Sequence, residues 1–140
     1  MKRVLVDTGP LVALLSGADE YHEPCVEALR ALPAPLLTCW PVLTEAAWLL
    51  RSHPTAIDRL LRSLTAGFLR LLPLDSADAE AIAGILRQYR TIRPQLADAA
   101  LVHLARRERI DTVFTLDQRD FSVYRGFRQR PFRILPELRR

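Results

Sequence analysis

Short apolar runs alternate along the chain with longer stretches that have helical periodicity. The short runs predict buried strands at 3–6, 36–39, 68–72, 111–115 and 132–135, the last at an edge of the sheet. Helices are predicted between them, at 10–15, 23–32, 41–51, 55–65, 79–89 and 96–109, several of them opened by proline or closed at glycine. Strands that alternate with helices indicate a parallel sheet with helices on both faces and right-handed crossovers.

This order predicts an α/β protein, an α/β/α sandwich around a central, mostly parallel sheet of four to five strands. The 140 residues contain no internal repeat, no low-complexity segment and no linker long enough to separate two units. We therefore expect residues 1–140 to form a single domain. With 49% hydrophobic residues the chain can bury a substantial core, which argues against disorder.

The net charge of the chain indicates which kinds of partner it can bind. The net charge is +4, and nearly all basic residues are arginine, since Lys2 is the single lysine. Arginine binds phosphate in a bidentate manner, so a polyanion such as RNA is a candidate partner, although a GC-rich or heat-adapted genome explains arginine equally well. From residue 119 onward, two acids face seven arginines, which indicates a phosphate-contacting surface or a solvated tail.

The two cysteines and the lengths of the apolar stretches indicate the compartment of the protein and whether it associates with a membrane. Cys25 and Cys39 have no CxxC partner and no nearby histidines at ligand spacing, so we expect two reduced thiols in a cytoplasmic protein. The first eighteen residues are similar to a secretory signal, but Asp7 and Pro10 interrupt the apolar run. No stretch approaches the roughly 20 apolar residues of a membrane span, so no membrane partner is expected.

Four acids follow predicted strands or open the helices after them. Asp7 follows the first strand, Glu45 and Asp98 lie near the starts of helices 41–51 and 96–109, and Asp117 follows the fourth strand. The carboxyl ends of parallel strands meet at one edge of a sheet, where ligands bind. Two carboxylates about 4 Å apart repel by about 4 kcal/mol at an effective dielectric of 20, so such a group must be protonated or bind a cation.

The donor set defines the kind of cation. Oxygen ligands without cysteine or histidine suit hard ions such as Mg²⁺ or Mn²⁺, and such ions beside arginines suit phosphoryl chemistry. More ordinary explanations stay open, because an acid in the first turn also interacts favourably with the helix dipole. Helix 41–51 is apolar nearly all round and is expected to be buried, with Glu45 on the same face as Trp48 and Leu49. Asp75 and Asp78 are interpreted as helix caps, and His103 as a surface or packing residue.

Four segments in order give the chain a family resemblance: VLVDTGPLVALL, LTEAAWLL, LADAALVHLA and TLDQRDF. With them the sequence resembles the PIN-domain nucleases, most closely the VapC-type toxins of toxin–antitoxin pairs, over essentially the whole chain. The resemblance implies a PIN-like fold and a Mg²⁺- or Mn²⁺-dependent endoribonuclease that leaves a 3′-hydroxyl and a 5′-phosphate.

The resemblance also implies roles for individual residues. Asp7, Glu45, Asp98 and Asp117 correspond to the catalytic, metal-binding acids, and Asp120 assists or replaces Asp117. Thr8 and Thr115 match the supporting polar positions beside the first and fourth acids. The family further implies a homodimer and an antitoxin protein that blocks the site. The arginines that we expect to steer RNA are Arg87, Arg90, Arg93 and Arg119.

Functions other than that of a toxin ribonuclease are a non-catalytic binding module, an RNA-processing nuclease, a phosphatase and a P-loop nucleotide hydrolase. A PIN-like module could bind RNA or protein without cutting, although degenerate members usually lose acids and this set is intact. An RNA-processing nuclease without an antitoxin would carry the same acids. A phosphatase with an aspartyl nucleophile typically needs a second acid two residues after the first, and Gly9 stands there. No glycine-rich lysine loop supports nucleotide hydrolysis of the P-loop kind.

Overall fold

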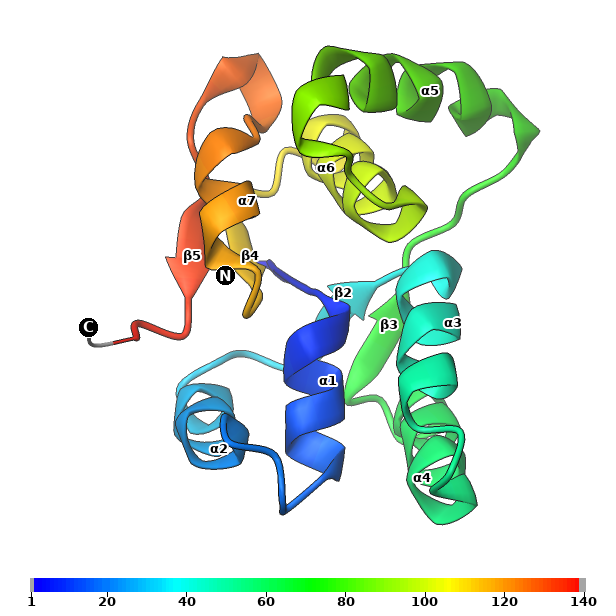
Figure 1. The fold of residues 1–140 in the computed structure, drawn as a ribbon, viewed down its shortest axis with the longest axis vertical. Helices are drawn as coiled ribbons and strands as arrows, with labels where there is room; N and C mark the ends of the chain where they lie inside the picture. Colours follow the sequence, from blue (N-terminus) through cyan, green and yellow to red (C-terminus); the bar gives the residue numbers. More distant parts are fainter. Residues whose placement is uncertain (1, 139–140) are drawn as a thin grey trace.

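The computed structural model describes residues 2–138, and its centre is one sheet of five parallel strands (Figure 1). All five predicted strands are confirmed, each slightly shorter than expected. The strands are β1 (Val4–Val6), β2 (Leu36–Thr38), β3 (Leu69–Leu71), β4 (Thr112–Phe114) and β5 (Arg133–Leu135). They lie in the order β3-β2-β1-β4-β5, so β5 is at an edge, as predicted.

The strand order reverses direction at β1. After β1 the chain adds β2 and then β3 on one side, and then returns to add β4 and β5 on the other side. Leu5 in the middle of β1 therefore pairs with Leu37 of β2 and with Val113 of β4. A reversal of this kind leaves a crevice between the carboxyl ends of the two strands that flank it, here β1 and β4.

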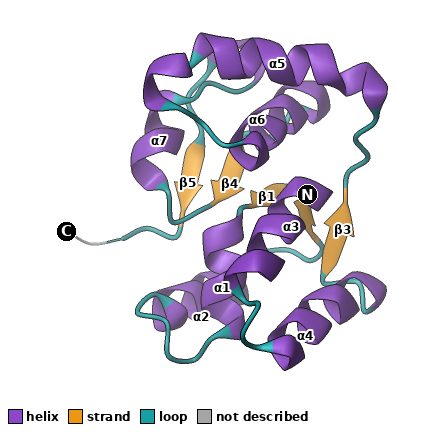
Figure 2. Cartoon of the chain, turned by 45° about the vertical axis from the view of Figure 1, so that its right-hand side comes forward, coloured by secondary structure: helices purple, strands orange, loops and turns teal. Residues whose placement is uncertain are grey.

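Helices cover both faces of the sheet, which confirms the predicted α/β/α sandwich (Figure 2). The helices are α1 (Thr8–Leu15), α2 (His22–Arg30), α3 (Trp40–Leu49), α4 (Pro54–Thr65), α5 (Ala79–Gln88), α6 (Leu96–Glu108) and α7 (Gln118–Val123). Helices α1, α2 and α4 lie together on one side, and α5, α6 and α7 on the other, while α3 contacts both α1 and α6. Of the helices formed by residues 2–138, none combines the length and the apolarity that crossing a bilayer requires.

Helix α6 is the most deeply buried helix. Every residue from 97 to 102 is buried, and three of these six are alanines, which allow close packing. The burial explains how one acid in this stretch, Asp98, comes to lie inside the protein with an exposed fraction of only 7%.

Helix α3 corrects a prediction. Its expected burial on all sides is wrong, because Trp48 and Leu49 are 63% and 52% exposed. Val42, Leu43 and Ala46 are buried along the face that packs against α1 and α6. The other side of the helix carries the exposed Trp48 and Leu49, and the guanidinium of Arg51 covers the ring of Trp48, 4.0 Å from its centroid.

The 3₁₀ turn Ser76–Asp78, which leads into α5, confirms the predicted capping. Asp75 accepts a hydrogen bond from the backbone of Ala77 at 2.8 Å, and Asp78 accepts one from the backbone of Asp75 at 2.9 Å. Asp78 also lies 2.8 Å from Nε2 of His103, so this histidine is a packing residue that ties α6 to the α5 cap. The neighbouring hydrogen bonds hold the pKa of Asp78 at about 2.

Candidate metal centre

Asp7 lies where β1 ends and α1 begins. Its backbone N–H still belongs to the sheet and donates to the carbonyl of Phe114 at 2.9 Å. Its side chain is only 5% exposed and accepts a hydrogen bond from the Thr115 hydroxyl, with 2.7 Å between Oγ1 and Oδ2. The pairing of β1 with β4 thus brings together two residues that are 108 positions apart.

Thr115 also fixes the second acidic segment. Its Oγ1 accepts a hydrogen bond from the backbone N–H of Asp117 at 3.0 Å. One buried hydroxyl therefore links the carboxylate of Asp7 to the start of α7, which carries Asp117 and Asp120. Thr8, the other polar residue predicted to support the site, is buried and donates to the carbonyl of Val42 in α3, with 3.3 Å between the oxygens.

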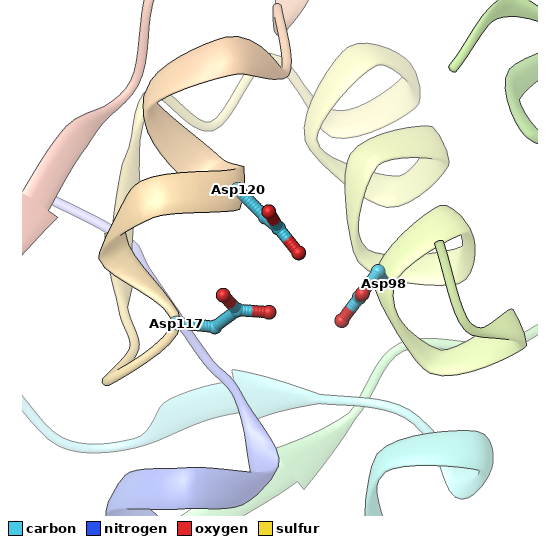
Figure 3. Close-up of side chains that lie close together, drawn as sticks. All are labelled: Asp98, Asp117 and Asp120. Atoms are coloured by element: carbon cyan, nitrogen blue, oxygen red, sulfur yellow. The ribbon is translucent and has the colours of Figure 1, made fainter. Parts of the chain in front are cut away.

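Three acids come close together at the crevice. Each of Asp98, Asp117 and Asp120 offers one carboxylate oxygen within 4.8 Å of the other two. Figure 3 shows the three side chains pointing into a common space, Asp98 from the first turn of α6, and Asp117 and Asp120 from the start of α7. Asp98 is buried, Asp120 is half-buried and Asp117 is exposed, so the group opens toward solvent on one side.

A cleft of about 410 Å³ joins this group to the remaining predicted acids. Its walls include every acid predicted for the site together with Thr8 and Arg93, and the acids are Asp7, Glu45, Asp98, Asp117 and Asp120. Arg93 is the only one of the four arginines predicted to bind RNA that lines the cleft. Arg87, Arg90 and Arg119 are exposed and do not line the cleft, and Arg87 is paired with Glu80 at 3.0 Å.

The surroundings of the cleft disfavour negative charge on its inner acids. Burial, together with the charges of Asp7 and Asp117, raises the pKa of Asp98 to about 7. Burial raises the pKa of Asp7 to about 6 despite the hydrogen bond from Thr115, and the charges of Glu45 and Asp117 add to this shift. Burial and the nearby Asp120 also raise the pKa of Asp117.

The five acids of the cleft have no arginine, lysine or histidine as an ion-pair partner in the described part of the chain. Carboxylates that are buried, close together and unpaired need either protons or a cation. Because every donor is an oxygen, the set fits a hard divalent ion such as Mg²⁺ or Mn²⁺ better than zinc or copper.

A larger groove elsewhere lacks this chemistry. It has a volume of about 700 Å³ and is lined mainly by apolar side chains of α1, α2 and α4, with Arg59, Arg62 and Ser63 as its polar residues. No carboxylate lines it, so the groove offers no ligand set for a hard cation and no acid–base pair.

Sequence reasoning missed some of the residues that shape the cleft. Gly9 faces Leu116 so closely that an added Cβ would lie 3.2 Å from the Leu116 Cβ. Gln95 caps α6, and its backbone N–H donates to Asp98 with 3.4 Å between N and Oδ2. Helix α7 was not predicted, because its six residues are too few to show a helical period.

A parallel sheet with a carboxylate-lined cleft at the point where its strand order reverses places this protein among the α/β proteins that bind a ligand at the carboxyl ends of their strands. The family model of the PIN domain matches residues 4–126, and the chain belongs to the PIN domain family. Among curated proteins it is similar to Ribonuclease VapC26 of Mycobacterium tuberculosis, with 31% identity over 136 residues, which cover 95% of this chain and 100% of the relative.

A solved structure supports the fold independently. The crystal structure of VapC20 of Mycobacterium tuberculosis, described as a toxin that cleaves the sarcin-ricin loop, superimposes with a TM-score of 0.71. The match covers 79% of this chain and 86% of the other, at 20% sequence identity. Because only 20% of the residues are identical, this match shows that the two proteins share a fold.

Proposed function

We propose that this protein is a Mg²⁺- or Mn²⁺-dependent endoribonuclease that hydrolyses phosphodiester bonds of RNA. The observation that carries the proposal is the set of five carboxylates from four separate segments that line one cleft. The ribonuclease name of the relative with 31% identity supports the same activity. The alternative is a PIN-like module that binds RNA or protein without cutting.

In this proposal Asp98, Asp117 and Asp120 hold the ion, because their oxygens lie within 4.8 Å of one another. Asp7 and Glu45 complete the acidic wall, and Asp7, Glu45, Asp98 and Asp117 are the catalytic acids. A bound divalent ion at such a site would supply activation of water and neutralisation of charge on the phosphate. The group fits the ion because it has only oxygen donors, and within residues 2–138 none of them forms an ion pair.

The residues of the chain would share the remaining work. Thr115 holds Asp7 and the start of α7 in a fixed relation, because its hydroxyl bonds to both. Arg93, on the wall of the cleft, would contact a phosphate of the RNA backbone through its guanidinium. The exposed Arg87, Arg90 and Arg119 would extend this contact along the RNA.

The test is cleavage of RNA by the purified protein with Mg²⁺ or Mn²⁺, with EDTA, and with the variant Asp98→Asn. We expect EDTA to abolish cleavage and Asp98→Asn to lower its rate by roughly 100-fold or more, since even residues that only support a ligand contribute about 10- to 100-fold. The matched control is Asp58→Asn, on the exposed side of α4 in an ion pair with Arg62 at 2.8 Å.

The outcome separates the two functions. Undiminished cutting by Asp98→Asn, or cutting that persists in EDTA, would contradict the proposed site. Binding of RNA without any cutting by the wild-type protein would favour the non-catalytic module.

We further propose that the chain is one PIN-like domain, that it forms a homodimer in the cytoplasm, and that an antitoxin protein neutralises it. The support is its similarity to relatives named as VapC proteins, one of which is described as a toxin. Co-expression with the product of the gene immediately upstream should yield a complex that no longer cuts RNA, and light scattering should give the mass of a dimer. A nuclease that stays active and uncomplexed would instead be an RNA-processing enzyme.

A further inference from the structure

Tyr124 lies directly behind the acids of α7. It follows the last residue of that helix and is completely buried, as one of the largest such side chains in the protein. Its ring packs edge-on against Tyr89 and Phe121, with centroids 5.0 Å and 4.9 Å away. These aromatic contacts fix the direction in which the Tyr124 hydroxyl points.

The Tyr124 hydroxyl reaches the deepest part of the acidic group. It donates to Asp98 with 3.3 Å between the phenolic oxygen and Oδ2. The backbone N–H of Gln95 donates to the same Oδ2 at 3.4 Å. No hydrogen bond from residues 2–138 reaches Oδ1 of Asp98. Both protein donors therefore hold one oxygen of the carboxylate and leave the other for a ligand.

We propose that Tyr124 is a positioning residue, which orients the Asp98 carboxylate so that Oδ1 faces the cation-binding space between Asp98, Asp117 and Asp120. This inference rests on the proposed metal-dependent function and adds to it a residue outside the cleft wall. It also couples two elements of the site, because Tyr124 follows α7 while Asp98 belongs to α6.

A purely structural role is the competing explanation. A buried phenol needs a hydrogen-bond partner, and Asp98 could serve Tyr124 rather than the reverse. Tyr89 offers the comparison, since it is also buried, and its ring contacts that of Tyr124. The Tyr89 hydroxyl bonds instead to the backbone N–H of Arg125 at 2.9 Å and to Arg106 at 3.4 Å, so it supports the same cluster without contacting Asp98.

The experiment compares Tyr124→Phe with Tyr89→Phe, each of which removes one buried hydroxyl and keeps the ring. Mn²⁺ binding is measured by calorimetric titration, and folding by thermal unfolding of the metal-free proteins. We expect Tyr124→Phe to weaken Mn²⁺ binding about tenfold. This is the lower end of the effects of such supporting residues, because 3.3 Å is long for a bond between oxygens. Tyr89→Phe should bind Mn²⁺ as the wild type does, although both variants lose thermal stability.

The possible results separate the positioning role of Tyr124 from the existence of the metal site. Wild-type affinity in Tyr124→Phe, or an equal loss of affinity in Tyr89→Phe, would overturn the positioning role while the metal site stands. A wild-type protein that binds no Mn²⁺ would overturn the proposed function together with this inference.

Discussion

Asp7 occupies a position in which a carboxylate is unfavourable without a partner. It is buried between β1 and α1, and the Thr115 hydroxyl donates a hydrogen bond to its carboxylate. The neighbouring Glu45 and Asp117 add repulsion, so the pKa of Asp7 rises to about 6. In the metal-free protein this residue therefore lowers the free energy of unfolding at neutral pH.

Asp7→Asn should stabilise the metal-free protein at pH 8. In the wild type the pKa of about 6 in the folded state lies above the ordinary aspartate value of 3.8, so the folded state holds the extra proton. The free energy of unfolding then falls as pH rises from about 4 to 6, and the penalty is complete above that window. The gain from the variant should be on the order of 1–3 kcal/mol at pH 8 and should disappear near pH 4. Denaturant unfolding in EDTA at both pH values measures it, and a variant less stable than wild type at pH 8 would count against the repulsion.

The sequence indicated the acids and the supporting Thr8 and Thr115, but not Gln95 and Tyr124, which bond to Asp98. Asp7, Glu45, Asp98 and Asp117 could be predicted because each follows a strand or opens the helix after one. The choice between Asp117 and Asp120 could not be made, and the structure brings both within 4.8 Å of Asp98. Tyr124 gave no signal, because a hydrogen bond to a residue 26 positions away depends on tertiary packing rather than on local pattern.

Helix α3 shows how apolar composition overstates burial at the level of an element. Its apolar residues surround the axis, yet only one side of the helix contacts α1 and α6. Composition cannot tell which apolar side lacks a neighbour, because that depends on the helices that surround it. The exposed side carries Trp40, Trp48 and Leu49.

One substitution made at two leucines of α3 compares the buried side of the helix with its exposed side. Leu43→Ala should lower the free energy of unfolding by about 2–5 kcal/mol, because the side chain is 2% exposed and its removal leaves a cavity. Leu49→Ala should change it by no more than about 0.5 kcal/mol, because the side chain is 52% exposed. Chemical denaturation of both variants at low protein concentration is the measurement. Equal losses would show that the outer face of α3 is covered in solution.

The molecule as a whole brings the acids together through its strand order. The alternation of strands and helices was enough to predict a parallel sheet, but not the order β3-β2-β1-β4-β5. That order makes β1 and β4 neighbours at the point where the sheet reverses, so Asp7 and Asp117 line one cleft although they are far apart in sequence. The apolar pattern of a strand does not indicate which other strand it pairs with, and the order therefore had to come from the structure.

The most direct test of the account is the binding of Mn²⁺ to the RNA-free protein, measured by electron paramagnetic resonance. Wild type and the control Asp58→Asn should bind Mn²⁺ with the same affinity, and Asp98→Asn should lose that binding. Binding should also tighten as pH rises from about 6 to 7, where Asp7 and Asp98 release their protons. Equal Mn²⁺ affinity in wild type and Asp98→Asn would contradict the claim that these acids hold a divalent ion.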